Sequence, residues 1–128
     1  MKPELKQAWI EALRSGKYEQ GTGLLKRDYS HMNTEAGATY CCLGVLLEVA
    51  SEKGILEVEF CKDLPESSGT SAKVFFENDY YAHLRGEYTF DVRERLELTY
   101  EQEAELISMN DTQRKSFLQI AEWIEENL

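Results

Sequence analysis

The sequence predicts an α+β domain that is mainly helical, with about four helices and a small antiparallel sheet. Its 128 residues are enough for one hydrophobic core and too few for two, so we treat residues 1–128 as a single domain. Apolar residues recur at helical spacing near both ends of the chain. Between these ends, short alternating or β-branched runs are separated by turn-forming residues, which is typical of strands.

The first helix is expected from Pro3 to Arg14, because proline suits the first turn of a helix. Ser15 and Gly16 follow, and glycine readily adopts the left-handed conformation that ends a helix. The apolar residues that repeat on one face are Leu5, Ala8, Trp9, Ala12 and Leu13.

A turn and a short extended segment are expected over residues 17–25, and an exposed polar loop over residues 26–38. Residues 40–50 are apolar on nearly every side, which predicts a buried helix that ends at Gly54 and forms the centre of the core. A strand is the alternative here, because three residues lower the helix propensity: Gly44, Val45 and Val49.

Three segments in the middle of the chain are expected to be strands. Residues 55–60 alternate apolar and polar side chains, and residues 73–76 and 87–92 are rich in aromatic and β-branched residues. A turn-rich loop over residues 65–71 and a loop around Gly86 separate these strands.

Two helices are expected near the C-terminal end. Thr99 followed by Gln102 is a capping-box pattern, and it predicts a helix that reaches Met109. Asn110 and Asp111 are expected to break this helix, or to cap it and its successor. The last helix is expected from Thr112 to Asn127, with its apolar face formed by Phe117, Ile120, Ala121 and Ile124.

The charge of the chain argues against duplex nucleic acid as a direct partner. Lysine and arginine total 14 against 24 acidic residues, so the formal net charge is -10 and phosphates are repelled at long range. The simplest role of this charge is solubility. An alternative is attraction of a basic protein, for instance by imitating the charge of nucleic acid.

The composition also predicts a compartment. Residues 1–9 hold no long apolar run, so we expect no signal peptide, no membrane span and a place in the cytosol of the bacterial host. The three cysteines are an odd number, and Cys41 and Cys42 are adjacent, which disfavours a disulfide between them. Reduced thiols are therefore expected.

Familiar catalytic patterns are missing from the sequence. The spacing of the cysteines and of the two histidines, His31 and His83, does not match the ligand pattern of a zinc site. The sequence also has no glycine-rich phosphate loop. A thiol enzyme using Cys41 or Cys42 is the least favoured hypothesis, because both thiols lie in an apolar run where burial makes them inert. We predict a non-enzymatic protein without cofactor or metal.

Tyrosine is the more informative residue type. Most of the seven tyrosines fall in predicted loops and strands, where a flat ring with one hydroxyl suits contact with a protein or a planar ligand. At least half of them are expected to cover the core instead. The run Asp79-Tyr80-Tyr81 is the best candidate for an exposed contact patch.

Four motifs together resemble a group of small uncharacterised proteins of bacteriophages and prophages. They cover most of the chain outside residues 52–97. The motifs are Trp9-x-x-Ala12-Leu13-x-Ser15-Gly16-x-Tyr18-x-Gln20-Gly21, the run from Tyr40 to Leu46, Met109-Asn110-Asp111, and Ser116-Phe117-x-x-Ile120-Ala121-x-Trp123-Ile124. The resemblance implies a phage setting, in which small accessory proteins often act on the host.

The leading hypothesis is a binding protein that inhibits or sequesters a host component, such as a defence protein, through its acidic face and exposed tyrosines. A nucleotide-like small molecule is the alternative ligand, in a pocket between residues 18–20 and 110–116. Self-association is a further possibility. The candidate binding residues are Tyr18, Gln20, Tyr80, Tyr81, Asn110, Asp111 and Ser116, and the cations available to a nucleotide are Lys17, Lys26, Arg27, Arg114 and Lys115.

Overall fold

The computed structural model describes residues 1–28, 37–62, 70–76 and 80–128. Within these residues the α-helices are α1 (Pro3–Arg14), α2 (Cys42–Glu52), α3 (Phe90–Leu96), α4 (Tyr100–Ile107) and α5 (Phe117–Asn127), and a π-helix, Ser108–Thr112, follows α4 directly. The strands are β1 (Glu19–Gln20), β2 (Lys26–Asp28), β3 (Ala38–Tyr40), β4 (Glu57–Lys62), β5 (Thr70–Phe75) and β6 (Tyr81–Leu84). The predicted α+β class is confirmed.

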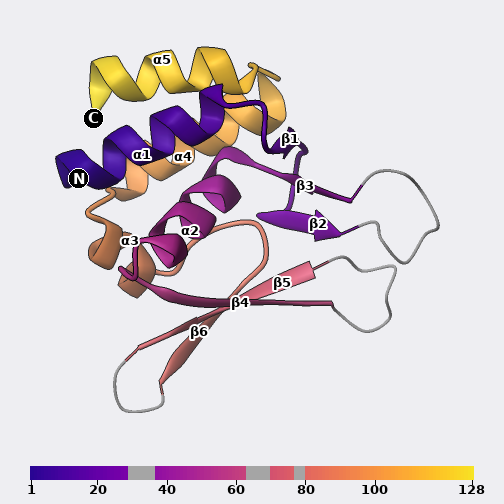
Figure 1. The fold of residues 1–128 in the computed structure, drawn as a ribbon, viewed down its shortest axis with the longest axis vertical. Coiled ribbons are helices and arrows are strands. Elements are labelled where there is room, and N and C mark those ends of the chain that lie inside the picture. Colours follow the sequence, from indigo (N-terminus) through magenta and orange to yellow (C-terminus); the bar gives the residue numbers. More distant parts are fainter. Residues whose placement is uncertain (29–36, 63–69, 77–79) are drawn as a thin grey trace.

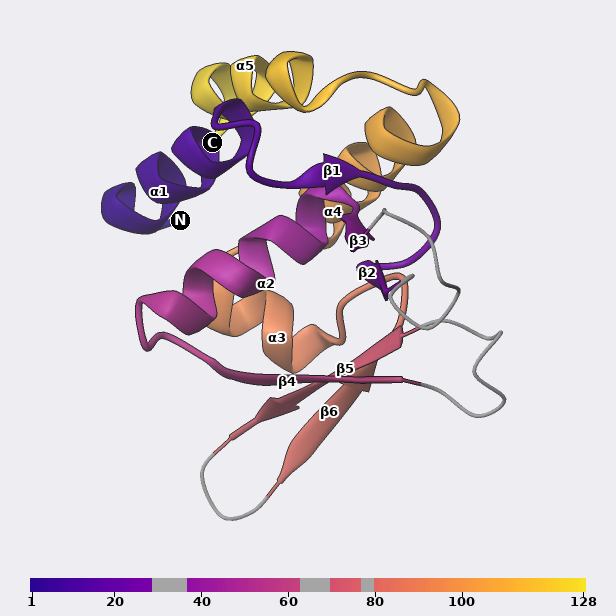
Figure 2. The ribbon, with the colours of Figure 1, turned by 45° about the vertical axis from the view of Figure 1, so that its right-hand side comes forward.

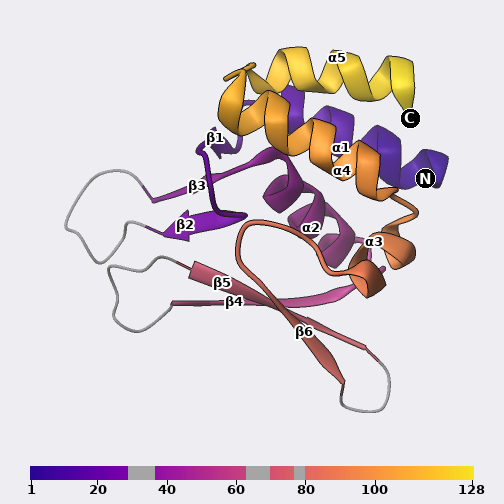
Figure 3. The ribbon, with the colours of Figure 1, turned by 180° about the vertical axis from the view of Figure 1, so that it is seen from behind.

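Helix α2 lies in the middle of the molecule, with α1, α4 and α5 on one side and the sheet β4–β5–β6 on the other (Figure 1, and from behind in Figure 3). Eight of its residues are buried, from Cys42 to Ala50. A helix with neighbours on opposite sides must be apolar all round, which explains the continuous apolar run in the sequence. The predicted buried helix is confirmed, and the strand alternative is wrong.

The N-terminal helix α1 has the predicted bounds and packs against α2 and α5. Trp9 is fully buried between these helices, and its indole Nε1 donates a hydrogen bond to the carbonyl of Cys42 at 2.9 Å. Gly16 follows the helix with a φ of 77°, the left-handed conformation expected there.

The second sheet is antiparallel, as expected, and has the order β4–β5–β6, while the first has the order β1–β3–β2 (Figure 2). In the second sheet the row Val58, Val74 and Ala82 is in register and faces the core. The adjacent row, Glu59, Lys73 and His83, projects from the opposite face because side chains alternate along a strand. In the first sheet β1 is parallel and β2 antiparallel to β3.

The predicted loop over residues 26–38 is wrong at both of its ends, which form β2 and β3 and pair through Arg27 and Thr39. Residues 29–36 lie outside the described residues. Of the predicted turn-rich loop over 65–71, the last two residues, Thr70 and Ser71, begin β5 instead, and the rest lies outside the described residues. Backbone pairing with neighbouring strands overrides the polar character of these short segments.

The predicted strand over residues 87–92 is also wrong. The third strand of the sheet is β6, at residues 81–84, and residues 90–96 form the helix α3. Val92 and Leu96 are buried while Glu94 between them is exposed, and a strand would place all three side chains on one face, whereas a helix does not. The alternation of Tyr88, Phe90 and Val92 suggests a strand only because it spans the start of the helix.

The capping box at Thr99 and Gln102 is confirmed. The break expected at Asn110 is wrong, because residues 108–112 continue α4 as a π-helix. Helix α5 starts at Phe117 rather than Thr112, since Ser116 and Gln119 form a second capping box that fixes its first turn.

Gly44 allows the backbone of Leu25 to pass directly over α2. A Cβ atom at position 44 would lie 1.7 Å from the Leu25 carbonyl oxygen. Leu25 cannot easily retreat, because its N–H donates to the carbonyl of Arg85 at 2.7 Å and its carbonyl accepts from Cys41 N–H at 3.3 Å. The first sheet is therefore tied to α2 by a contact that only glycine permits.

We expect Gly44→Ala to lower the free energy of unfolding by about 3 kcal/mol or more, because the clash with backbone outweighs a gain in helix propensity of about 1 kcal/mol. Urea denaturation followed by circular dichroism measures this change. Gly37→Ala is the matched control, since a Cβ at Gly37 meets no atom within 4 Å. Equal stability of the two variants would contradict the close approach.

Candidate functional site

The polar residues predicted to bind near the helix ends come together, but they bind one another. Gln20 Nε2 donates to Asn110 Oδ1 at 3.0 Å and to the carbonyl of Lys115 at 2.8 Å. Gln20 Oε1 accepts from the N–H of Phe117 at 3.1 Å. Because Phe117 is the first residue of α5, Gln20 satisfies a backbone donor that has no partner within that helix.

Asn110 is buried and uses both ends of its amide. Nδ2 donates to the carbonyl of Gly21 at 2.8 Å and to Asp111 Oδ1 at 2.7 Å, while Oδ1 also accepts from Cys42 N–H at 3.3 Å. Ser116, at the start of α5, accepts from Gln119 N–H at 3.2 Å. The side-chain amides of Gln20 and Asn110 are therefore engaged inside the protein rather than presented to a ligand.

Tyr18 borders a separate hollow of about 420 Å³. Its ring contacts Tyr40 edge-on, with 5.0 Å between the centroids. Partial burial raises the pKa of Glu48 in this hollow, while Lys17 pairs with Glu52 at 3.6 Å. The residues that line it are Lys17, Tyr18, Glu19, Gly37, Ala38, Tyr40, Glu48 and Glu52.

Tyr80 and Tyr81 are both exposed, with 53% and 48% of their surface accessible. They lie in different surroundings, however. The ring of Tyr81 is 5.8 Å from Phe75, its partner in the second sheet, whereas the ring of Tyr80 is 5.5 Å from Phe76 and borders α3. Asp79, the other member of this predicted patch, lies outside the described residues.

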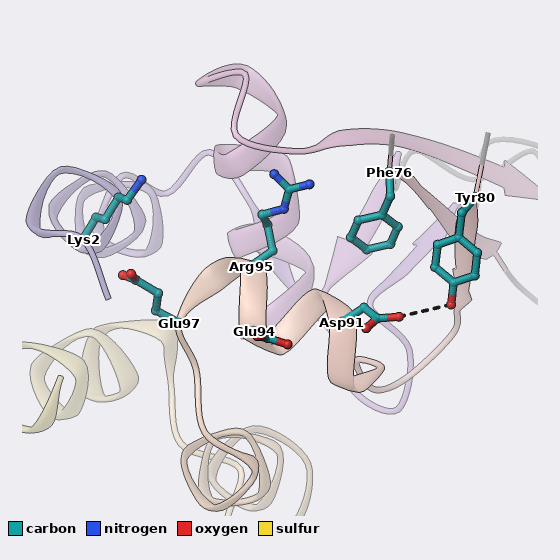
Figure 4. Close-up of a pocket in the computed structure, with 7 residues that line it drawn as sticks. All are labelled: Lys2, Phe76, Tyr80, Asp91, Glu94, Arg95 and Glu97. Carbon is teal, nitrogen blue, oxygen red and sulfur yellow. Dashed lines mark hydrogen bonds between the residues drawn. The ribbon is translucent and has the colours of Figure 1, made fainter. Parts of the chain in front are cut away.

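A hollow of about 530 Å³ lies between Tyr80 and α3 (Figure 4). The Tyr80 hydroxyl donates to Asp91 Oδ2 at 3.2 Å, and this hydrogen bond raises the pKa of Tyr80. The guanidinium of Arg95 lies 5.8 Å from the ring centroid of Phe76. The hollow is lined by Lys2, Phe76, Tyr80, Asp91, Glu94, Arg95 and Glu97.

A second hollow, of about 440 Å³, also borders α3 and shares Glu94 and Glu97 with the first. Phe90 and Tyr100 line it and leave 67% and 65% of their surfaces exposed. Helix α3 is therefore bordered by two hollows, each with aromatic side chains. We call Tyr80, Phe90, Asp91, Glu94, Glu97 and Tyr100 together the α3 surface.

A buried ion pair fixes α3 against α4. Arg93 Nη1 lies 3.0 Å from Glu103 Oε1, and it also donates to the carbonyl of Tyr88 at 2.9 Å. The other carboxylate oxygen of Glu103 accepts from Tyr88 N–H at 2.6 Å. These bonds use both carboxylate oxygens of Glu103 and Nη1 of Arg93, so they hold α3 against α4 beneath the rings of the α3 surface.

The end of α3 has an unusual backbone. Glu97 takes the left-handed conformation, with φ 58° and ψ 42°, at the position where glycine is the common residue. A side chain in this conformation costs roughly 1 kcal/mol. Its half-exposed carboxylate lies on the rim of both hollows and pairs with the N-terminal ammonium of Met1 at 3.8 Å.

Of the predicted binding residues, only Tyr80 belongs to the α3 surface. Sequence reasoning assigned Phe90 and Asp91 to a strand over residues 87–92, so it predicted no helix beside which Glu94, Glu97 and Tyr100 would gather. The signal that identifies α3 is Glu94 between Val92 and Leu96, because a strand would place this charged residue on the same face as the two apolar ones. The exposure of Phe90 has no sequence signal, because an aromatic residue in a predicted strand is expected to be covered.

The two adjacent thiols lie at the start of α2 and are buried. Burial raises the pKa of Cys41 to about 12 and raises that of Cys42 well above its ordinary value. Neither thiol is therefore an activated nucleophile. Among the described residues, no group of three or more potential ligands from His, Cys, Asp and Glu is placed to hold a metal ion.

A protein-family model described as a domain of unknown function, DUF8296, matches residues 1–128. The chain therefore belongs to this uncharacterised family. No curated protein and no solved structure matches it significantly. Within the described ranges, none of the helices combines the length and the apolar composition needed to cross a lipid bilayer.

The thiols give a direct chemical test of this geometry. We expect iodoacetamide at mildly alkaline pH to label folded protein once, at the half-buried Cys61, and unfolded protein three times. Intact-mass spectrometry counts the labels. Rapid labelling of Cys41 or Cys42 in folded protein would contradict their burial and revive a thiol-dependent activity.

The amide network predicts that a single substitution at Asn110 causes a large loss of stability. We expect Asn110→Ala to lower the free energy of unfolding by about 2–4 kcal/mol, because Cys42 N–H and the Gln20 amide lose a partner inside the protein. Urea denaturation measures the loss. The control Gln113→Ala removes an exposed amide from the same turn and is expected to change stability by about 0.5 kcal/mol or less.

Proposed function

We propose that this member of a domain family of unknown function is a non-catalytic binding protein that contacts another protein through the α3 surface. One observation carries the proposal: Tyr80, Phe90 and Tyr100 are each more than half exposed around a helix of seven residues. Large apolar side chains that gather on a surface mark interaction sites, and aromatic residues dominate the energy of protein contacts.

The shape of this surface supports a protein partner. Its hollows of about 530 and 440 Å³ lie beside a single helix, so a segment that crosses α3 contacts both of them. The supporting ion pair between Arg93 and Glu103 holds α3 before any partner arrives. Preorganisation of this kind lowers the cost of association.

A nucleotide-like ligand has less support. The residues proposed to form its pocket, Gln20 and Asn110, hydrogen-bond to each other. The hollow beside Tyr18 is rimmed by the carboxylates of Glu19, Glu48 and Glu52, which oppose a phosphate. The α3 surface is therefore the better candidate for a binding site.

The resemblance to phage and prophage proteins supplies a setting for this proposal. In that setting the partner is a protein of the bacterial host, which the chain inhibits or sequesters. A host defence protein is one such target. The high acidity of the chain suits this role, because charge complementarity speeds association with a partner of opposite charge.

Substitution of the exposed rings tests the proposal. We expect tagged wild-type protein to recover a stoichiometric partner from bacterial cells, and Phe90→Ser to weaken its affinity about tenfold or more, because a central aromatic contact is lost. Affinity for the purified partner is measured by calorimetry. Leu118→Ser is the matched control, since Leu118 on α5 is 61% exposed but distant from α3 in the sequence and outside both of its hollows.

The combined variant Tyr80→Ser, Phe90→Ser and Tyr100→Ser extends this test. It is expected to abolish capture while keeping the circular dichroism spectrum of the wild type, because all three rings are exposed. Full retention of the partner by this variant would move the contact to another face. Recovery of the chain with no protein partner would refute the proposed function.

A further inference from the structure

Resting on the proposed function, we infer that the α3 surface takes a basic segment of its partner, in which arginine or lysine stands beside a large apolar residue. The cationic group seats at the Tyr80–Asp91 end of the first hollow. The apolar side chain seats among Phe90, Leu98 and Tyr100 in the second hollow.

The distribution of charge gives the first reason. Residues 87–105, which include α3 and most of α4, hold seven acidic and two basic residues. This formal charge of -5 is half of the -10 of the whole chain. Glu103 of this segment is buried, and Lys2 and Arg95 line the first hollow. The attraction for a cationic segment is therefore centred on the carboxylates of Asp91 and Glu94, which form no ion pair among the described residues.

The hydrogen bonds and ion pairs give the second reason. Arg93 is occupied by Glu103, so it does not neutralise the carboxylates of the surface. Asp91 accepts one hydrogen bond from Tyr80, and within the described residues Glu94 has neither a hydrogen bond nor an ion pair from its side chain. Both are exposed and can bind a guanidinium or an ammonium group.

The arrangement of side chains in the first hollow decides where the cation sits. Lys2 lies beside Glu97 at one end, while Asp91 lies beside Tyr80 at the other (Figure 4). The Lys2 end already holds a positive charge. Arg95 lies over Phe76 between them, which shows that a guanidinium packs on an aromatic ring here. The Tyr80–Asp91 end offers a second ring with an adjacent carboxylate.

The second hollow supplies the apolar half of the recognition. Phe90, Leu98 and Tyr100 contribute its apolar lining, and Arg93, which pairs with Glu103, packs 5.4 Å from the centroid of the Tyr100 ring. Glu94 lines both this hollow and the first one. A segment that crosses α3 at Glu94 therefore meets a carboxylate and an apolar hollow within one or two of its own residues. Alternating basic and apolar side chains fit this order.

The backbone at Glu97 is consistent with the same use. Glycine would remove the conformational cost at this position, yet the chain carries a carboxylate there, which lies on the rim of both hollows and pairs with the N-terminal ammonium of Met1 at 3.8 Å. A strained residue at a surface site is consistent with use of its side chain. We expect Glu97→Gly to raise the melting temperature by about 2–4 °C and to weaken the affinity for the partner.

The probe is an octapeptide of alternating arginine and leucine, blocked at both ends and titrated into ¹⁵N-labelled full-length protein. We expect the shifted amide signals to cluster in residues 89–100. A peptide with serine in place of leucine keeps the charge and is expected to bind more weakly. A peptide with glutamate in place of arginine is expected not to bind.

Two variants of equal net charge separate a seated cation from general attraction. The test variant carries Asp91→Asn, Glu94→Gln and Glu97→Gln. The control variant carries Glu105→Gln, Glu122→Gln and Glu126→Gln, all exposed and outside the α3 hollows. We expect the test variant to lose about tenfold in affinity for the arginine–leucine peptide, and the control to lose about twofold.

Equal losses in the two variants, or signals that shift over the whole molecule, would overturn the inference. Binding of the glutamate peptide would also overturn it. Repeating the comparison with the captured partner separates the two proposals. If Phe90→Ser disrupts that complex but the charge variant does not, protein binding stands and the basic segment is refuted. If neither disrupts it, the α3 surface is not the contact.

Discussion

The hydrogen bonds between Gln20 and Asn110 hold together segments that are far apart in the sequence. Through these two amides, β1, the start of α2, the π-helix and the start of α5 share one polar centre inside the fold. Each helix start has backbone N–H groups without a partner in its own helix, and the amides satisfy one at α2 and one at α5. The C-terminal helices can therefore pack on α1 and α2 without leaving these groups unsatisfied.

Much of this fold was predictable wherever a local pattern fixed the structure. The spacing of Leu5, Trp9 and Leu13 defines α1, and the pair Thr99 and Gln102 defines the start of α4. The start of α3 lacks such a pattern, because Thr89 is followed three residues later by Val92, and the helix has no side-chain cap. The short strands β2 and β3 were unpredictable for another reason: they form by pairing with neighbouring strands, β2 with β3 and β3 also with β1.

The candidate site was less predictable than the fold. The exposure of Tyr80 follows from its polar, turn-rich surroundings. Its place beside α3 depends on the antiparallel pairing of β5 with β6, which brings the rings of Phe76 and Tyr80 together. Gln20 and Asn110 looked suited to a ligand because they are polar and lie near helix ends. Polar residues at helix ends serve the chain itself just as well, and only the geometry distinguishes the two uses.

The central place of α2 has an evolutionary consequence. A helix covered on both sides tolerates little change, so the Cys-Cys-Leu-Gly-Val-Leu run should persist among relatives even where they bind different partners. The most recognisable stretch of the family would then record how the protein folds, and functional divergence would accumulate in the short peripheral helix instead. Relatives sorted by residues 90–100 should group by target, whereas those sorted by residues 42–50 should group only by descent.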